Sequence, residues 1–506
     1  MATKTTRPRR LRTMTEMVVL VPVTVALAIM GMAVASRSVR PRRPDRSKGS
    51  ERRQFQPDEA GVGGQIPAAM AMTGAAVALL MWSLGTDAAL AIVLMTACGL
   101  LFLLGCLNLR WMIDAWWTPE NHEMRRSDAV DVDHGRLVSL IVPARHEVDV
   151  LESTLEQLAE QAYHNLEVIV VVGHDDPETA KVAQDTAERL GERFEVVVDT
   201  SPTKNKPRAL NAGLAACTGD IVGVFDAEDH VHPALLQHVV AAFDDASVSV
   251  VQGPVQLINH DSTWFTVHNV LEYFFYFGSR LHHHARAGFI PLGGNTVFIR
   301  RRIAEAYGGW DAENLTEDCE LGVRLSSSGE QVRVIYRPDL ATVEEAPITL
   351  REFVRQRSRW NQGFIQTYRK GLWRSLPLRQ RLLARLILTM PLIQAMTFVL
   401  IPSTVLLGVL HGFPLVVALA TFLPLTILVT TGIVQLIGLR EFARAYDRPL
   451  TVRTQIGMLL GMIPYGIVLT YAAMRAMLRE ARGERGWEKT VHVDAHRSPR
   501  LQEATV

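Results

Sequence analysis

The chain has 506 residues, a formal net charge of +1 at pH 7 and 48% hydrophobic residues. A chain of this length has room for more than one domain. The near-neutral charge argues against a nucleic-acid-binding protein, for which a strongly basic domain is expected. The four cysteines have no metal-binding spacing and are typical of a reduced intracellular domain.

Several apolar segments are long enough to cross a bilayer, which takes about 20 helical residues. Between the third and the fourth lies a stretch of about 275 residues with ordinary soluble composition. The sequence therefore predicts a soluble domain inserted between two transmembrane helical blocks. The segments are Met17–Ala35, Pro67–Gly85, Ala88–Leu109, Leu386–Leu410, Phe413–Ile437 and Gln455–Leu478.

The predicted domain boundaries follow this division. The charged C-terminal tail is poor in apolar residues, which predicts disorder there. The segments are a basic tail (1–16), an N-terminal transmembrane block (17–109) with a basic linker (36–66), a soluble domain (130–345), amphipathic interface helices (346–380), a C-terminal transmembrane block (386–478) and the charged tail (479–506).

Basic residues near the apolar segments predict the orientation, because cytoplasmic loops are enriched in Lys and Arg. The linker between Arg37 and Arg53, Arg110 after the third segment and Arg440 after the fifth share one side if the soluble domain is cytoplasmic. We therefore expect a multi-pass protein of the cell membrane. Basic residues before the first and after the last segment fit poorly, which leaves open whether those two segments span the bilayer or lie at its surface.

The soluble part alternates predicted strands and helices. This order implies parallel strands with right-handed crossovers, and ligands then bind beyond the carboxyl ends of the strands. Neither a dinucleotide-binding GxGxxG after the first strand nor a phosphate-binding GxxxxGK[ST] is present, which disfavours a dehydrogenase or a P-loop ATPase. The predicted strands are Arg136–Pro143, Glu167–Gly173, Phe194–Asp199 and Asp220–Phe225, and the helices are Leu151–Ala162, Thr179–Leu190 and Ala209–Ala216.

An acidic cluster follows the fourth predicted strand directly. Asp226 and Glu228 are spaced i, i+2, with Asp229 as a third candidate ligand. Two carboxylates at a strand end can hold a divalent metal that bridges a diphosphate. An exposed acidic turn is the alternative.

A second acidic motif, Thr316-Glu317-Asp318, precedes a predicted helix. One of these carboxylates could serve as the general base that takes the proton of an acceptor hydroxyl. The alternative is helix capping, with Thr316 at the N-cap and the two acids in the first turn.

The segment Leu350–Lys370 is predicted to form an amphipathic helix. Its residues Gln356, Arg359 and Trp360 share one face, because they are spaced i, i+3 and i+4. A guanidinium suits phosphate oxygens, and an indole offers a flat surface to a sugar ring. A basic helix at the membrane surface is the alternative and is compatible with this role.

Together these motifs resemble the processive membrane glycosyltransferases of family 2, which include cellulose, chitin, hyaluronan and poly-N-acetylglucosamine synthases. The resemblance covers residues from about Val138 to Gly371 and, by architecture, the flanking apolar segments. The matching motifs are VPARHE (Val142–Glu147), KPRALNAGL (Lys206–Leu214), FDAED (Phe225–Asp229), GGN (Gly293–Asn295), TED (Thr316–Asp318) and QRSRW (Gln356–Trp360).

The resemblance implies an α/β GT-A fold and an inverting transfer from a nucleotide sugar, with UDP-sugars expected first. It implies that Mg²⁺ or Mn²⁺ is bound by Asp226, Glu228 and Asp229. Asp318 would be the catalytic base, next to Glu317. The usual Asp-x-Asp is Asp226-Ala227-Glu228 here, which puts the second metal ligand in doubt.

The resemblance also implies two sets of binding residues. An acidic pair that the family has after the second strand is displaced here to Asp175–Asp176, which makes its nucleotide role less secure. The acceptor side would be Gly294, Asn295 and Trp360. The donor side would be Glu147, Asp175, Asp176, Lys206, Gln356 and Arg359.

Three functions compete at this point. The first is a polymerase that extends a β-linked polysaccharide and feeds it through the membrane. The second is a single-transfer enzyme that glycosylates a lipid, and the third is a non-catalytic scaffold that binds nucleotide sugars. The sequence leaves open the sugar, the acceptor and whether an export partner is coupled.

Overall fold

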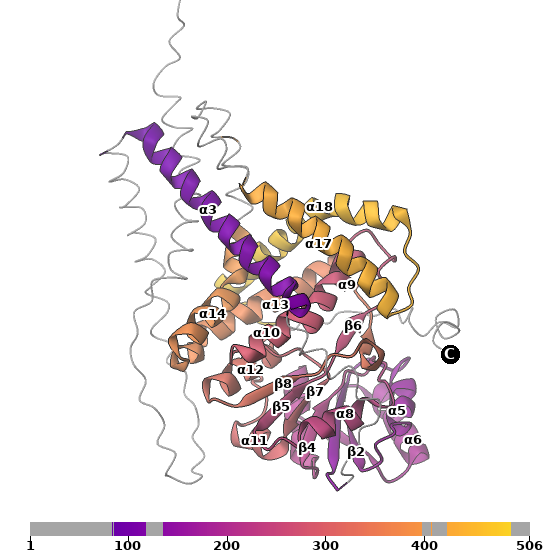
Figure 1. Ribbon diagram of the computed structural model, residues 1–506. Helices are drawn as coiled ribbons and strands as arrows, with labels where there is room; N and C mark the ends of the chain where they lie inside the picture. Colours follow the sequence, from indigo (N-terminus) through magenta and orange to yellow (C-terminus); the bar gives the residue numbers. More distant parts are fainter. Residues whose placement is uncertain (1–82, 84, 118–134, 397–405, 407–422, 487–506) are drawn as a thin grey trace, which may run out of the picture.

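In the computed structural model, the protein is described for residues 83, 85–117, 135–396, 406 and 423–486 (Figure 1). Its centre is a seven-stranded sheet in the order β3-β2-β1-β4-β7-β5-β8. A two-stranded parallel sheet of β6 and β9 lies beside it. The strands are β1 (Val138–Ala144), β2 (Leu166–Gly173), β3 (Phe194–Asp199), β4 (Ile221–Val224), β5 (Val248–Gln252), β6 (Val255–Leu257), β7 (Val297–Arg300), β8 (Gln331–Val334) and β9 (Thr342–Glu344).

The first four strands confirm the predicted parallel arrangement. β1 pairs in parallel with both β2 and β4, and β2 pairs in parallel with β3. Their apolar runs form strands because both faces of the sheet are covered by helices. The strand order reverses between β1 and β4, which is where an open α/β sheet forms its binding crevice.

The two faces of the sheet carry separate apolar cores. Leu140, Val142 and Val168 pack on one face, and Ile141 and Ile169 on the other, since side chains alternate along a strand. Burying each such side chain stabilises the fold by about 1.5–3 kcal/mol. The first face is covered by α5 (Leu151–Ala159), α6 (Pro177–Leu190) and α8 (Leu235–Ala242), and the second by α7 (Lys206–Ala216), α10 (Leu281–Arg286), α11 (Arg301–Ala306) and α12 (Glu317–Ser327).

The later part of the domain departs from simple alternation. β7 runs antiparallel to both β4 and β5, so it reverses the chain direction inside the sheet. Close packing there depends on Gly223 of β4, because an added Cβ would stand 2.6 Å from the ring of Phe298 on β7. β7 thereby brings the residues that precede it to the carboxyl end of β4.

A layer of helices separates this sheet from the long apolar helices (Figure 1). The helix α13 has the predicted bounds, with Thr349 as N-cap and Gly371 in the left-handed conformation at φ 72°. Glu480 of α18 accepts hydrogen bonds from Gln366 at 3.1 Å and from Arg369 at 2.6 Å, so α13 is tied to the membrane block. The layer contains α9 (Thr266–Phe275), the π-helix η3 (Tyr276–Arg280), α13 (Leu350–Lys370), η5 (Leu372–Ser375) and α14 (Leu378–Leu388), and the apolar helices are α3 (Thr86–Met112), α17 (Leu423–Ala445) and α18 (Val452–Ala481).

Three of the described helices are long and apolar enough to cross a membrane, namely Ala88–Met112, Pro424–Ala445 and Val452–Ala481. They confirm apolar helices at the third, fifth and sixth predicted segments, with shifted ends. Two predicted segments, Met17–Ala35 and Pro67–Gly85, lie outside the described residues except for residues 83 and 85. Of Leu386–Leu410, the described part is residues 386–396 and 406. The length and apolar composition of these helices identify the chain as a membrane protein.

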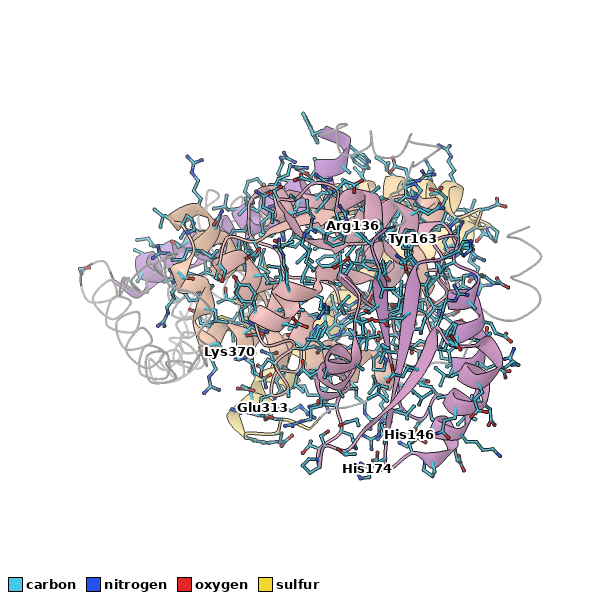
Figure 2. The ribbon with its side chains drawn as sticks, turned by 90° about the horizontal axis from the view of Figure 1, so that it is seen from below. Arg136, His146, Tyr163, His174, Glu313 and Lys370 are labelled. Atoms are coloured by element: carbon cyan, nitrogen blue, oxygen red, sulfur yellow. The ribbon has the colours of Figure 1, made fainter. Side chains whose placement is uncertain are left out.

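The sheet also has a clear polarity. Figure 2 shows His146 and His174 together at one end of the strands, with Arg136 and Tyr163 at the other. His146 follows β1 and His174 follows β2, so their end is the carboxyl end. The candidate site lies at this end.

Candidate active site

A cavity of about 1080 Å³ opens at the carboxyl ends of the strands. It is lined both by polar residues of the domain and by residues of the apolar helices. The predicted site residues that reach it are Glu147, Lys206, Asp226, Glu228, Gly294, Asn295, Glu317, Asp318, Gln356, Arg359 and Trp360. Segments more than 200 residues apart in the sequence therefore meet at one place.

The acidic loop after β4 contains two half-buried carboxylates and one fully buried carboxylate. Asp226 and Glu228 line the cavity, whereas Asp229 is fully buried and does not. Asp229 accepts a hydrogen bond from the Asp226 N–H at 2.8 Å and from the Asn295 amide at 2.9 Å. Burial and the neighbouring carboxylates of Glu344, Asp226 and Glu228 raise the pKa of Asp229 well above its usual range. Asp229 therefore stabilises the loop from its buried side, while Asp226 and Glu228 face the cavity.

Asn295 has a structural task besides its predicted contact with the acceptor. Its amide donates to Asp229 and to Glu344, which also lines the cavity. The next residue, Thr296, has φ 50° and donates its N–H to the Val224 carbonyl at 2.8 Å. This turn fixes Gly294 and Asn295 at the end of β4. Sequence reasoning missed Glu344, because its three-residue strand gives no periodic signal.

Lys206 extends from the start of α7 into the acidic centre. Asn205 caps the helix by accepting from the Arg208 N–H at 3.1 Å, which directs Lys206 inward. The Lys206 ammonium contacts Asp226 and donates to the Gly294 carbonyl at 2.9 Å. Burial alone would lower the pKa of Lys206, but the carboxylates of Asp226 and Glu317 raise it above the usual lysine value.

The predicted base lies in the first turn of α12. Thr316 occupies the N-cap position, but its side chain makes no capping hydrogen bond. Glu317 and Asp318 both line the cavity, so capping does not account for them. Burial, followed by the charge of Asp318, raises the pKa of Glu317 to about 7. Burial also raises the pKa of Asp318, while Lys206 and Arg359 counteract the increase.

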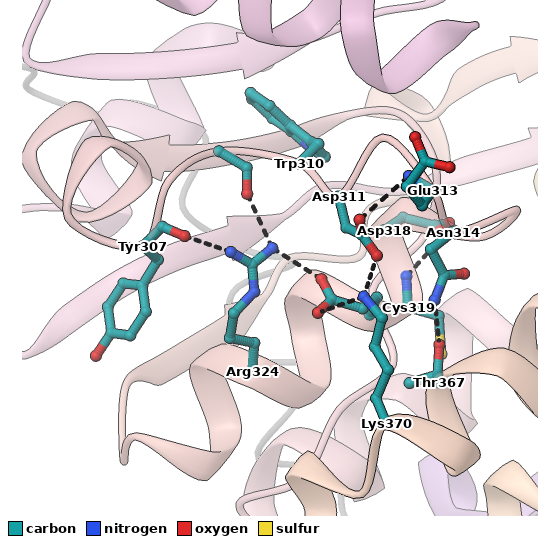
Figure 3. A network of polar contacts seen from close by, with 12 residues as sticks. Tyr307, Trp310, Asp311, Glu313, Asn314, Asp318, Cys319, Arg324, Thr367 and Lys370 are labelled. Carbon is teal, nitrogen blue, oxygen red and sulfur yellow. Dashed lines mark hydrogen bonds and ion pairs between the residues drawn. The ribbon is translucent and has the colours of Figure 1, made fainter. Parts of the chain in front are cut away.

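The loop before α12 is held by α13. The Leu315 N–H donates to Gln366 at 3.1 Å. The Asn314 amide donates to Thr367 at 3.0 Å, as Figure 3 shows. Gly363 of α13 permits this approach, because an added Cβ would stand 2.3 Å from the Thr316 hydroxyl oxygen. The position of the two carboxylates therefore depends on α13.

The same helix presents its predicted face to the cavity. Gln356, Arg359 and Trp360 all line it, together with Arg357. Arg359 is under the influence of Glu317, Asp318 and Asp226, which partly offset the lowering of its pKa by burial. Arg357, which the sequence reasoning left without a role, pairs with Glu272 and lies 4.5 Å from the centre of the Trp360 ring. It therefore fixes the indole plane by a cation–π contact.

The acidic pair after β2 lies at the edge of the site. Asp175 pairs with Arg145 at 2.6 Å, and Asp176 accepts from the His146 N–H at 2.6 Å. Asp176 is also the N-cap of α6, where it accepts from the Thr179 N–H at 3.3 Å. Neither lines the cavity, whereas Arg145 and His146 do. The pair thus orders the loop after β1, and its predicted donor contact stays a prediction.

The cavity thus brings together the carboxylates of Asp226 and Glu228, the carboxylates of Glu317 and Asp318, and the basic side chains of Lys206 and Arg359. Residues 134–363, which hold all of these groups, match the family described as glycosyltransferase like family 2. These residues form a family 2 glycosyltransferase domain. The core of this domain is a GT-A-like α/β sheet.

Known proteins similar to this chain differ in the length over which they align with it. A probable glycosyltransferase of Bacillus subtilis (strain 168) is 30% identical over 235 residues, which are 45% of this chain and 54% of that protein. The chain thus spans about half the length of that relative. The beta-monoglucosyldiacylglycerol synthase of Trichormus variabilis is 27% identical over 364 residues, covering 70% of this chain and 76% of the synthase.

A solved structure shares the fold. It is a mannosyltransferase from Pyrobaculum calidifontis in complex with GDP-Man and Mn²⁺, with a TM-score of 0.50 and 20% identity. The match covers 78% of this chain and 99% of that one. It supports the GT-A assignment of the glycosyltransferase domain.

Proposed function

We propose that this protein transfers a sugar from a nucleotide sugar, by inversion, to a hydroxyl of a membrane lipid. The observation that supports this acceptor is the shared cavity. Its wall includes the carboxylates of Glu317 and Asp318 and also Leu101 and Leu104 of the apolar helix α3. A lipid can then reach the base without leaving the bilayer.

The part of the cavity proposed to bind the nucleotide sugar has ligands suited to a divalent cation. Within the described residues no group of three or more His, Cys, Asp or Glu forms a metal cluster. Asp226 and Glu228 nevertheless offer hard oxygen ligands to the cavity, and a diphosphate and water would complete the shell that Mg²⁺ or Mn²⁺ prefers. The bound cation would neutralise the charge of the departing diphosphate. Lys206, Gln356 and Arg359 would contact the same oxygens.

Asp318 is the proposed base for the acceptor. The hydroxyl oxygen forms a bond to the anomeric carbon, its proton passes to the Asp318 carboxylate, and the bond from that carbon to the diphosphate breaks. The nucleoside diphosphate leaves with the electron pair. Asp318 is held for this by the Cys319 N–H, which donates to its Oδ1 at 2.7 Å.

A polysaccharide synthase is the second candidate. Trp360 favours it, because an indole fixed by Arg357 offers a flat surface on which a sugar ring of a growing chain can stack. For either acceptor we propose a multi-pass protein of the cell membrane with its catalytic domain in the cytoplasm, as the basic linkers predict.

Nucleotide release by the purified full chain, measured with a panel of UDP- and GDP-sugars and Mn²⁺, tests the proposal. Donor-specific release with a product that partitions into organic solvent supports lipid glycosylation, whereas a high-mass water-soluble product supports the polysaccharide synthase. EDTA should stop either reaction. Full activity in EDTA would contradict the role of Asp226 and Glu228, and silence with every donor would favour a non-catalytic scaffold.

A further inference from the structure

The cationic side chains of the cavity wall differ in their counter-ions. Five of them form a direct ion pair with a carboxylate, and a sixth, Arg359, has two neighbouring carboxylates that act on it electrostatically. They are Arg145 with Asp175, His146 with Asp176, Lys204 with Asp199, Lys206 with Asp226, Arg357 with Glu272 and Arg359 with Glu317 and Asp318. The seventh is Arg280, which makes no ion pair with any residue that the structure describes.

The contacts of Arg280 are with neutral groups. Its guanidinium donates to the side-chain oxygen of Asn108 and lies 5.8 Å from the centre of the Trp111 ring. Its Nε is buried and has no hydrogen-bond partner among the described residues. Glu272 also acts electrostatically on Arg280, but its direct ion pair is with Arg357. Burial lowers the pKa of Arg280, but a guanidinium remains charged at neutral pH.

The backbone holds Arg280 rigidly at the end of the membrane helix. Arg280 closes the π-helix η3, a distortion that is often found at functional sites. Its neighbour Ser279 donates to the Trp111 carbonyl at 2.8 Å and accepts from the Ala115 N–H at 2.9 Å. Among the described residues, this half-buried charge has no direct ion-pair partner, and the one carboxylate that acts on it already pairs with Arg357. Such a charge is costly, which indicates a site for an anion.

The position of Arg280 corresponds to the head-group level of a bilayer. Asn108 lies four residues before Met112, the end of the candidate span, which is about 6 Å along a helix. Trp116 and Trp117 follow directly and expose 41% and 70% of their surfaces. Exposed tryptophans are typical of the membrane–water interface.

Apolar and catalytic groups lie on either side of Arg280. Leu101, Leu104 and Asn108 of α3 are spaced i, i+3 and i+7, so one face of this helix borders the cavity. On the other side, Tyr276 is close enough to both Asp318 and Arg280 for each charge to act on its phenol. The order along the wall is thus apolar helix, guanidinium and catalytic carboxylate.

We propose that Arg280 binds the phosphate of an anionic phospholipid whose head-group hydroxyl receives the sugar. This inference rests on the proposed lipid glycosylation and specifies its acceptor. The acyl chains would lie along Leu101 and Leu104, the phosphate at Arg280, and the hydroxyl near Asp318. Such an acceptor carries its hydroxyl a few bonds from a phosphodiester, as phosphatidylglycerol does.

The test compares two acceptors in nanodiscs of phosphatidylcholine that contain equal mole fractions of phosphatidylglycerol or of diacylglycerol. For Arg280→Gln we expect kcat/KM for phosphatidylglycerol to fall about ten- to hundredfold, since a charge-assisted hydrogen bond is lost. Transfer to the neutral diacylglycerol and the KM of the donor should not change. Arg302→Gln, an exposed arginine of α11, is the matched control and should behave as wild type.

Asn108→Asp is a second variant that keeps the side-chain shape. It gives Arg280 an internal counter-ion and should therefore also abolish the preference for the anionic lipid. Equal losses on both lipids would assign Arg280 a structural role, and a raised donor KM would assign it to the diphosphate. Either result, or unchanged use of phosphatidylglycerol, overturns the inference. A polymeric product with no glycosylated lipid would instead contradict the proposed function itself.

Discussion

Replacing Glu317 with Gln should stabilise the protein at alkaline pH. The pKa of this carboxyl is raised from 4.5 to about 7 in the folded state, chiefly by burial. The folded protein thus holds the proton more tightly than the unfolded chain does. The resulting loss of stability is absent below pH 4.5, grows as the pH rises and is complete above about pH 7. A difference of about 2.5 pKa units corresponds to about 3 kcal/mol at pH 8.

The measurement is the thermal unfolding midpoint of the detergent-purified chain at pH 8 and at pH 5. For domains of 150–250 residues, each kcal/mol moves the midpoint by about 2–4 °C, so a rise of several degrees is expected at pH 8. At pH 5 the same substitution should change the midpoint little, because the wild-type carboxyl is already protonated in the folded state. An increase of equal size at both pH values, or a decrease at pH 8, would refute this reasoning.

The matched control is Glu320→Gln, one turn further along the same helix. Glu320 is equally buried but pairs with Arg324 at 2.8 Å and with Lys370 at 3.3 Å, two side chains that Figure 3 shows converging. Removing its charge leaves both cations without this partner. We therefore expect destabilisation at pH 8 by about 1–3 kcal/mol, the opposite sign to Glu317→Gln.

Three further predictions concern the site. Asp318→Asn should lower kcat by about 10²–10⁴ and leave donor binding nearly intact, as measured by calorimetry with the nucleotide; equal loss of both would contradict its role as base. In the pH profile of kcat/KM, the midpoint of the acid limb should lie above the ordinary aspartate pKa of 3.8. Lys206→Met should move this midpoint to higher pH, because Lys206 lowers the pKa of Asp318. An unshifted midpoint would argue against Asp318 as the titrating group. Gly363→Ala should push α13 away from Thr316, because the Thr316 backbone nitrogen would lie 2.7 Å from the new Cβ. We expect the free energy of unfolding to fall by about 1–3 kcal/mol and most of the activity to be lost. The control Gly457→Ala, whose Cβ meets no atom within 4 Å, should change neither stability nor activity.

The fold could be predicted from the sequence where an apolar segment ends at a residue typical of strand or helix ends. The strands β1 to β4 were predicted because each is an apolar run with a Pro, Gly or Asp at or next to its end, and the helix α13 because it combines a helical period with a Thr cap. The strands β6 and β9 have three residues each and give no such signal. The role of Glu344 could not be foreseen for this reason, since only the pairing of β6 with β9 brings it to Asn295.

The candidate site residues were also predicted from local sequence motifs. A motif identifies which residues gather, but not which of them face a ligand. Asp229 and Asp176 belong to acidic clusters that were predicted to bind ligands, yet both are buried and accept hydrogen bonds from the backbone of neighbouring loops. Arg280 belongs to no motif, and only the placed side chains show that it forms no direct ion pair within the described part of the chain.

The helix α13 also fixes the distance between the proposed base and the apolar helix α18. It positions the loop before Asp318 through Gln366 and Thr367, and it is fastened to α18 through Glu480. The proposed base, Asp318, is thus held at a fixed distance from the apolar helix α18. For the proposed lipid acceptor, we therefore expect the length of the head group to decide whether its hydroxyl reaches Asp318.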